Sequence, residues 1–194
     1  MAAAKIFSEK GYHLATTTEI AEELGVHQST LYYYLKSKEQ ALEQICAVAI
    51  EGYVSFSEEI RKRKGPVSVK IRDVMFQHII TIRDRPSFFK AFQSNRKDLG
   101  AAARHAIGRQ IRRYEANIEA ILKQAAAAGV MRANVNTLHA AMALIALCNS
   151  VSIWWPARSA EPIERIADEL AEMFMAGIFL AASKSTKSRP AKLS

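Results

Sequence analysis

The chain has 194 residues, of which 49% are hydrophobic and 24% charged, and its net charge is +8. This composition is ordinary for a globular protein of one or two domains whose core is large enough to be stable without disulfide bonds. The two cysteines, Cys46 and Cys148, have neither a disulfide framework nor a metal-binding spacing, so no metal or cofactor is expected. The apolar runs are too short and interrupted to span a bilayer, and the N-terminus lacks a signal peptide, so a cytoplasmic location is predicted.

The basic charge is unevenly distributed along the chain. Residues 1–46 contain four lysines and six glutamates, a net charge of −2. By contrast, residues 61–72 contain six basic residues and no acidic one, and residues 83–113 contain nine basic and two acidic residues. The tail 184–194 adds four more basic residues. A basic protein suggests a polyanionic partner, and here the excess lies outside the first 46 residues.

The N-terminal segment begins with two predicted helices. Residues 2–10 have a helical pattern that Gly11 should stop. The stretch "TTTEIAEELG" then predicts a second short helix. Thr16 and Glu19 have the spacing of a capping box at its start, although Thr17 could cap the helix instead.

A tight turn and two further helices follow. Gly25 is expected to end the second helix, and a third short helix carries Leu31. Ser37 or Lys38 should cap a longer helix, which breaks at "RKRKGP" near residues 65–66. This order of short helices gives a helix, a glycine turn and a helix.

The rest of the chain also has helical periodicity and almost no strand-like alternation, so the predicted fold class is all-α. Further helices are expected at about residues 67–83, 87–95, 100–128, 135–155 and 162–182. The predicted domains are a helix-turn-helix DNA-binding domain at 1–46, an effector-binding and dimerisation domain at 47–183, and a basic flexible tail at 184–194.

The two short helices have a physical use in binding DNA. Two helices held at a steep angle let the second enter the major groove, and its first turn then needs small or hydrogen-bonding residues. Gln28, Ser29 and Thr30 supply an amide, two hydroxyls and a methyl group for base edges. The hydroxyl groups of the tyrosines at 32–34 and the ammonium group of Lys38 can reach flanking phosphates.

The pattern "LGVHQSTLYYYLKSK" resembles the recognition segment of the tetracycline repressor (TetR) family, and the likeness covers about 40 residues. It implies that Thr17 and Lys38 contact phosphates from helix starts, that Gln28, Ser29 and Thr30 face bases, and that the three tyrosines reach the groove wall. It also implies a homodimer that reads two half-sites of an operator. The DNA-binding residues expected on these grounds are Thr17, Thr18, His27, Gln28, Ser29, Thr30, Tyr32, Tyr33, Tyr34 and Lys38. The implied core of the domain is Ala3, Phe7, Ile20, Ala21, Leu24, Val26 and Leu31.

Several positions in this segment keep alternative roles. Tyr32 is as consistent with a core or boundary position as with DNA contact, and His27 could cap its helix, touch DNA or simply be exposed. The chain starts a few residues before Phe7, so no minor-groove arm contact is expected. Because residues 1–46 are net acidic, the salt dependence of DNA binding should be shallow.

The larger segment shows no catalytic constellation, so no enzymatic activity is predicted. The segment 135–155 is apolar nearly all round, with one stripe through Leu138, Met142 and Asn149 and another through Ala141 and Cys148. Such a helix must be covered on both sides. Together with 162–182 it could form a buried hairpin in a monomer, but the TetR resemblance implies a four-helix interface between two copies.

The segment 112–179 resembles TetR-family members that regulate fatty-acid or sterol catabolism and release DNA on binding acyl-CoA thioesters. The features that carry this likeness are "RYE" at 113–115, "AGVMRANVN" at 128–136, Asn149, "WWPAR" at 154–158 and Gly177. A CoA ester has an apolar tail and a charged phosphate head. The candidate tail-lining residues are Phe76, Phe88, Phe89, Phe92 and Met142, the candidate phosphate-binding residues are Arg96, Lys97, Arg104, Arg109, Arg112 and Arg113, and Asn149 is a further effector-binding candidate. These phenylalanines could equally be core, and the charges a solvated face.

The sequence therefore predicts a TetR-type transcriptional regulator, a cytoplasmic homodimeric repressor that a small-molecule effector releases from a palindromic operator. The effector is expected to be an acyl-CoA or another anionic amphipathic molecule. The alternatives are a transcriptional activator with the same DNA-binding head, or a helical small-molecule-binding protein without DNA function.

Overall fold

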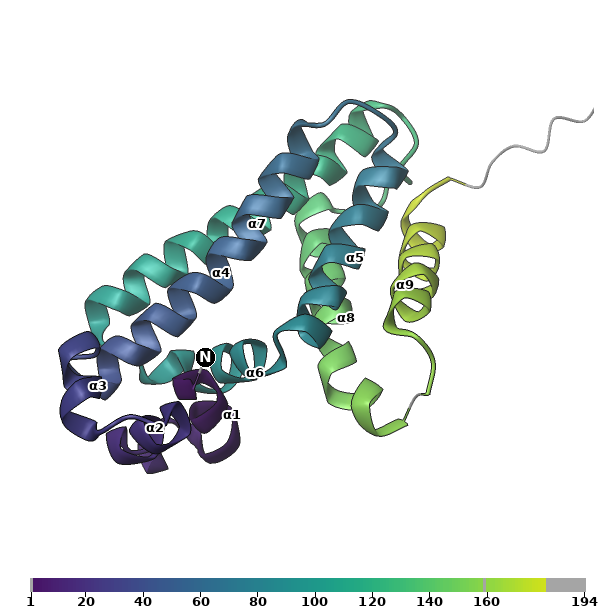
Figure 1. Cartoon of the computed structure of the whole chain (residues 1–194). Coiled ribbons are helices and arrows are strands. Elements are labelled where there is room, and N and C mark those ends of the chain that lie inside the picture. The colour runs from purple at the N-terminus through teal and green to yellow at the C-terminus, as the bar shows by residue number, and fades with distance from the viewer. Residues whose placement is uncertain (1, 159, 181–194) are drawn as a thin grey trace, which may run out of the picture.

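The computed structural model describes residues 2–158 and 160–180, and these form an all-α fold (Figure 1). The helices are α1 (Ala2–Leu14), α2 (Thr17–Leu24), α3 (Gln28–Tyr34), α4 (Lys38–Lys62), α5 (Val67–Asp84), α6 (Pro86–Asn95), α7 (Ala101–Ala127), α8 (Thr137–Arg158) and α9 (Ile163–Ile178), with a 3₁₀ turn at Arg96–Asp98. The predicted fold class is confirmed, while the tail 184–194 lies outside the described residues.

The first helix differs from its prediction. It does not stop at Gly11 but continues to Leu14 across a kink, where Gly11 takes φ 78° and ψ 162°. Positive φ is open to glycine without steric cost, so the chain bends there and resumes the helix. Asn95 of α6 holds this bend, because its Oδ1 accepts a hydrogen bond from the Tyr12 amide (2.7 Å) and its Nδ2 donates to the Phe7 carbonyl (3.3 Å).

The turn chemistry around α2 is as predicted. The Thr16 side chain accepts from the Glu19 amide and the Glu19 carboxylate accepts from the Thr16 amide, which completes a capping box. Gly25 ends α2 in the left-handed conformation, with φ 67°. Ser37 caps α4 by accepting from the Gln40 amide. These local signals fix where α2 and α4 begin and where α2 ends.

The predicted core of the N-terminal domain is only partly correct. Phe7, Ile20, Ala21 and Leu31 are buried and Ala3 is half-buried, but the prediction was wrong for Leu24 and Val26, which are 50% and 38% exposed. The remaining buried positions come from α1, from the residues that follow α1 and α3, and from the start of α4, namely Ala2, Ala4, Ile6, Ala15, Leu35, Ala41, Leu42, Ile45 and Cys46. In so short a bundle, helical periodicity alone does not show which face the neighbouring helices cover.

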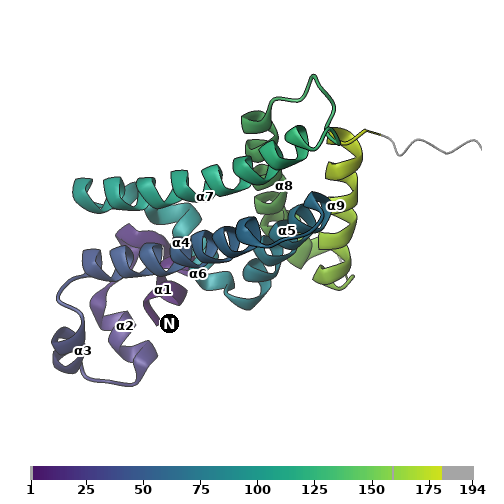
Figure 2. The same ribbon diagram turned by 90° about the horizontal axis from the view of Figure 1, so that it is seen from above.

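The helices form an elongated bundle with the N-terminal domain at one end (Figures 1 and 2). The two longest helices, α4 and α7, lie side by side and connect the two ends. Helix α6 packs against α1, while α9 packs against α5 at the end far from α3. The long helix α4 thus belongs to both parts of the molecule, as the sequence suggested.

Helix α8 is less fully covered than its sequence pattern requires. The sequence-based prediction that no apolar run is long enough to cross a membrane was wrong for Thr137–Trp155. By length and composition this segment meets that criterion, with a mean hydropathy of 1.5, and 28% of it is buried. The core helix of a globular protein meets the same criteria. Here Ala141, Leu144, Cys148 and Val151 face the core with no exposed surface, whereas Ile153 is 81% exposed. Within the described part of one chain, the other apolar face therefore remains open.

Candidate nucleic-acid interface and effector cavity

Helix α3 presents its polar N-terminal turn to solvent. Gln28, Ser29 and Thr30 are all exposed, and so is Thr18 at the start of α2. His27 occupies the N-cap position of α3 but makes no side-chain capping bond and is also exposed. Of the three roles left open for His27, a side-chain cap is thus not observed. These residues form the free end of a helix that can enter a groove.

The three tyrosines do not belong to the core. Tyr33 and Tyr34 are 83% and 75% exposed and pack edge to face, with ring centroids 5.0 Å apart. Tyr32 is 48% exposed, which excludes the core position considered for it. Exposed aromatic rings with hydroxyl tips can contact sugars and phosphates along a groove wall.

Thr17 links α2 to α3 through its hydroxyl group. The Gln28 Nε2 donates to Thr17 Oγ1 (3.1 Å), and the Tyr32 hydroxyl lies 3.1 Å from the same oxygen. One side chain at the first turn of α2 therefore orients both a candidate base-contacting amide and a candidate phosphate-contacting hydroxyl. Such preorganisation lowers the entropy lost when these groups bind a ligand.

Lys38 has a structural role beside its predicted contact with phosphate. Its Nζ donates to the carbonyls of Ala15 (2.9 Å) and His13 (3.2 Å) and lies 4.6 Å from the centre of the Tyr12 ring. An ammonium group has three hydrogens, so one remains for a phosphate. Lys38 thus holds the start of α4 against the end of α1.

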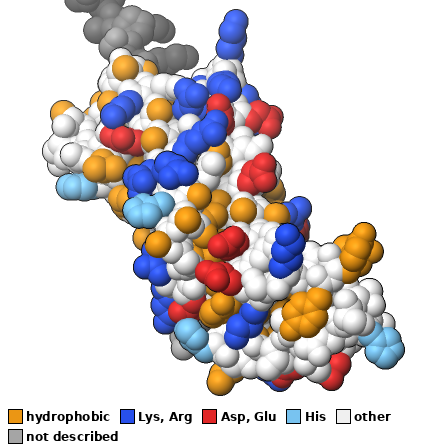
Figure 3. Space-filling view, turned by 90° about the vertical axis from the view of Figure 1, so that its left-hand side faces the viewer, with side chains coloured by type: hydrophobic (Ala, Val, Ile, Leu, Met, Phe, Trp, Pro, Cys, Tyr) orange, Lys and Arg blue, Asp and Glu red, His pale blue; other side chains and the backbone are white. Residues whose placement is uncertain are grey.

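The lysines of α1 form ion pairs with glutamates of α2. Lys5 pairs with Glu23 (2.8 Å), and Lys10 pairs with Glu19. The hydrogen bond from Lys10, and then those from Thr16, lower the pKa of Glu19 to about 2. Basic side chains instead form a band across another part of the surface (Figure 3). The acidic N-terminal domain therefore offers few unpaired charges to a phosphate backbone.

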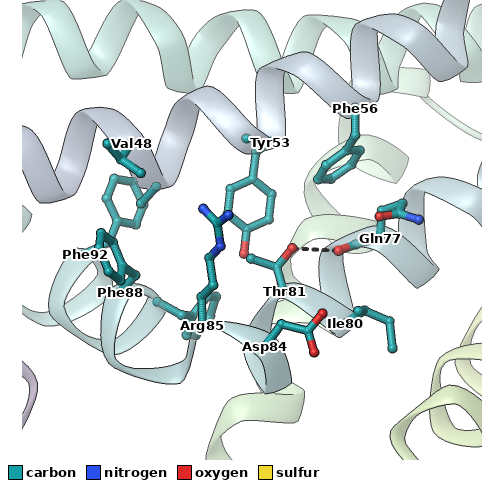
Figure 4. Close-up of a pocket in the computed structure, with 13 residues that line it drawn as sticks. Val48, Tyr53, Phe56, Gln77, Ile80, Thr81, Asp84, Arg85, Phe88 and Phe92 are labelled. Carbon is teal, nitrogen blue, oxygen red and sulfur yellow. Dashed lines mark hydrogen bonds between the residues drawn. The ribbon is translucent and has the colours of Figure 1, made fainter. Parts of the chain in front are cut away.

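The larger domain contains two neighbouring cavities. One has a volume of about 240 Å³ and lies between α4, α5 and α6, where Arg85 and Tyr53 extend into the space between the helices (Figure 4). The second has a volume of about 150 Å³ and is bounded by α4, α5, α6, α7 and α8. Tyr53, Phe89 and Phe92 line both cavities, so three aromatic rings stand between them.

The second cavity has a polar side built from four helices. His78 Nδ1 lies 2.7 Å from the Tyr114 hydroxyl, and His78 Nε2 lies 3.0 Å from Asn149 Oδ1. Gln93 Nε2 donates to the same Asn149 oxygen (3.0 Å). Burial lowers the pKa of His78 to about 4 and raises the pKa of Tyr114, so both side chains are neutral at physiological pH.

The structure brings together only part of the predicted effector site. Phe92, Arg96 and Asn149 line the second cavity, and Phe88 lines the first. Three other residues named in the prediction lie outside these cavities. Two of them, Phe76 and Met142, pack half-buried against the core and line neither cavity.

The third residue, Arg113, likewise lies outside both cavities. It pairs with Glu58 (2.5 Å) and borders a separate groove between α4 and α7 together with Arg109. Arg104 donates to the carbonyls of Leu99 and Lys97, so it holds the start of α7. Arg96 lies 5.5 Å from the centre of the Phe92 ring. It lines the second cavity, as expected of a residue that binds the phosphates of an effector.

Sequence reasoning missed most of the residues that line these cavities, including four with polar side chains. Tyr53, His78, Gln93 and Tyr114 lie on different helices, and no spacing along the chain relates them. Tyr114 stands in the quoted "RYE" stretch, which was the one available signal. Within residues 2–158 and 160–180, no group of three or more His, Cys, Asp or Glu side chains could hold a metal ion.

Comparisons with known proteins agree with this geometry. Residues 1–45 match the family model "Bacterial regulatory proteins, tetR family", and residues 64–178 match "Tetracyclin repressor-like, C-terminal domain". The fatty acid metabolism regulator protein of Bacillus subtilis (strain 168) is 21% identical over 91% of this chain and 92% of its own length.

Two solved structures are similar in fold. The TetR family transcriptional regulator PfmR from Thermus thermophilus has a TM-score of 0.83 and 26% identity, over 90% of this chain and 95% of its own. The transcriptional regulator FadR from Bacillus subtilis, solved in complex with stearoyl-CoA, has a TM-score of 0.74 and 21% identity, over 91% of this chain and 96% of its own. With family models covering both its N-terminal helices and most of its larger domain, the chain belongs to the tetR family and is a transcriptional regulator.

Proposed function

We propose that this regulator is a homodimeric repressor that binds a palindromic operator through α3 and leaves it when an effector enters the larger domain. The exposed polar turn of α3, with Gln28 tethered to Thr17, is the observation that carries the DNA-binding part. The proposed DNA contacts are those predicted from the sequence, with Lys38 limited to one free hydrogen. No catalytic step is proposed, and the expected location is the cytoplasm.

The proposed dimer forms through α8 and α9. Ile153 of α8 is 81% exposed, Met173 of α9 is 68% exposed and Leu138 is 48% exposed. Apolar side chains at this density on two adjacent helices favour a second copy of the same face. A two-fold dimer would also present two copies of α3 to successive half-sites of an operator.

The proposed effector is an acyl-CoA or another amphipathic anion. The paired cavities are lined by aromatic and aliphatic side chains, and Arg85 and Arg96 lie at their edges. Neither cavity alone reaches the roughly 300–1,000 Å³ of typical small-molecule sites, so Tyr53, Phe89 and Phe92 must move aside for a ligand that fills both. The stearoyl-CoA complex of the similar regulator supports this ligand class.

Helix α6 provides a direct mechanical link between the cavities and the N-terminal domain. Phe89, Phe92 and Gln93 of α6 line the cavities, and Asn95 of the same helix binds the Gly11 bend of α1. A ligand that displaces α6 would therefore change the position of α1 and with it the spacing of the two α3 helices. Such a ligand acts by binding one arrangement more tightly than the other.

Gly52 offers a sharp test of the effector site. This helical glycine lines the first cavity, and a Cβ built on it meets no atom within 4 Å. Gly52→Leu should fill the cavity without strain, and Gly52→Ala is the matched control because it adds helix propensity but little volume. Operator DNA selected from random sequences would be titrated in a mobility-shift assay with octanoyl-CoA, palmitoyl-CoA or free CoA.

We expect both thioesters to release wild-type protein and Gly52→Ala from DNA, with free CoA inactive. Gly52→Leu should bind DNA normally but need about tenfold more thioester. If thioesters strengthen DNA binding, the protein is an activator, or a repressor that uses the thioester as its co-repressor. Failure to select any sequence at moderate salt would favour a small-molecule-binding protein without DNA function.

A further inference from the structure

Four residues from four helices form a chain of hydrogen bonds beside the second cavity. They are Gln93 of α6, Asn149 of α8, His78 of α5 and Tyr114 of α7. His78 and Tyr114 are 2% and 4% exposed, so solvent does not compete for their contacts. The chain runs from the buried interior of the domain to the amide groups at the cavity wall.

The direction of these hydrogen bonds follows from the chemistry of the groups. A carbonyl oxygen only accepts, so His78 Nε2 must carry the hydrogen that it shares with Asn149 Oδ1. The buried ring is neutral, so its Nδ1 accepts from the Tyr114 hydroxyl. Asn149 Oδ1 thus has two donors, His78 and Gln93, and both amide groups are fixed in orientation.

The buried Tyr53 hydroxyl, which lines the same cavity, has no hydrogen-bond partner among the described residues. Within the hydrogen-bonded chain itself, two further polar groups have none. They are the Nδ2 of Asn149 and the Oε1 of Gln93, which make no side-chain or backbone hydrogen bond in residues 2–158 and 160–180. Both side chains line the 150 Å³ cavity, whose other walls include Ile50, Phe89 and Ile145. A donor and an acceptor next to each other in an apolar cavity match a group that both donates and accepts, as a hydroxyl does.

We propose that Asn149 and Gln93 bind a hydroxyl group on the apolar part of the effector, so that the regulator responds to oxygenated acyl groups in preference to saturated ones. This inference rests on the proposed effector response and specifies its ligand. His78 and Tyr114 are positioning residues for the hydroxyl group, because they act on it through the Asn149 amide. A site built to hydrogen-bond a hydroxyl discriminates strongly against the analogue that lacks it.

Calorimetric titration of the full chain tests the proposal. The thioester probes are octanoyl-CoA, 3-hydroxyoctanoyl-CoA and 8-hydroxyoctanoyl-CoA, and the three corresponding free acids are titrated in parallel. The variant is Asn149→Leu, which keeps the side-chain size and removes the amide. Ser150→Ala is the matched control, because the Ser150 hydroxyl donates to the Leu147 carbonyl of its own helix and lines neither cavity.

The wild type and Ser150→Ala should bind at least one hydroxylated thioester about tenfold more tightly than octanoyl-CoA. Asn149→Leu should lose this preference and bind the hydroxylated thioesters no more tightly than octanoyl-CoA. Equal binding of all three thioesters by the wild type would overturn the inference and leave the proposed effector class intact. If Asn149→Leu weakens the binding of all three thioesters equally, the Asn149 amide contacts a group that they share. That result would also overturn the inference.

The free acids separate the two proposals. If no thioester binds but one hydroxylated acid binds more tightly than octanoate, the inference holds and the acyl-CoA proposal fails. If no probe binds, both fail. Tyr114→Phe tests the positioning role, since it should reduce the ratio of the affinities for the hydroxylated and the plain thioester. A Tyr114→Phe protein with full preference would show that Tyr114 does not position Asn149.

Discussion

The Nε2 of Gln28 donates a hydrogen bond to the Oγ1 of Thr17 over 3.1 Å, so the first residue of α3 is tethered to the first turn of α2. The amide that should select a base is thereby held in place before DNA binds. We expect Gln28→Ala to lower operator selectivity by about 1–3 kcal/mol per half-site. Competition binding between the selected operator and its single-base variants measures this selectivity. Unchanged selectivity would show that Gln28 does not contact a base.

Thr17→Val provides a contrasting prediction. Valine keeps the shape of threonine but removes the oxygen that Gln28 and Tyr32 share. Because Thr17 is also a candidate phosphate contact, the variant should weaken binding to random DNA, and it should weaken operator binding further because Gln28 loses its tether. A loss confined to the operator would instead assign Thr17 only to the orientation of Gln28.

The salt dependence of operator binding should be shallow. Glutamates already pair with Lys5 and Lys10, and Lys38 donates to two backbone carbonyls. Among the described residues of the N-terminal domain, Lys36 is therefore the exposed lysine that has no ion pair. The slope of log affinity against log salt should be less steep than about −8 per dimer. A steeper slope would mean that the basic surface of the larger domain also contacts DNA.

Dimerisation should depend on the exposed apolar residues of α8 and α9. The double variant Ile153→Glu, Met173→Glu places charge on side chains that are 81% and 68% exposed in one chain, so it should fold but sediment as a monomer. Its operator affinity should fall with the loss of the second half-site. Leu14→Glu is the control, since Leu14 is 77% exposed on α1, far from this face, and this variant should remain a dimer.

His78 should make folding stability depend on pH. Its pKa is about 4 in the fold against an ordinary value of 6.5, so below pH 6.5 the unfolded chain takes up a proton that the folded chain does not. The contribution of His78 is therefore complete above pH 6.5 and is lost as the pH falls towards 4, by about 3 kcal/mol. Urea unfolding between pH 4 and 7 should show a flatter curve for His78→Gln, whereas the exposed His139→Gln should follow the wild type.

Local chemistry explains which parts of the fold were predictable from the sequence. The capping box at Thr16, the left-handed Gly25 and the Ser37 cap each involve residues within a few positions of one another, and all three were found where expected. Leu24 and Val26 were misplaced because their burial depends on which helices pass above them, which helical periodicity does not state.

The candidate sites differ in the same way. The candidate DNA-binding surface is one continuous segment, so its exposed residues could be named in advance. The cavity combines α4 to α8, and Gln93, His78 and Asn149 meet only after these helices pack. Phe76 and Met142 were taken for cavity residues because an apolar side chain in a helix has the same sequence pattern whether it faces a cavity or a neighbouring helix.

The bend at Gly11 also determines how the molecule can be divided. A cut after residue 46 would remove Asn95, leaving the Tyr12 amide and the Phe7 carbonyl without the side chain that binds them across the bend. It would also truncate α4, which runs on to Lys62. We therefore expect the N-terminal helices to be less stable when cut there than in the whole chain, and a unit that also contains α6 to keep the bend.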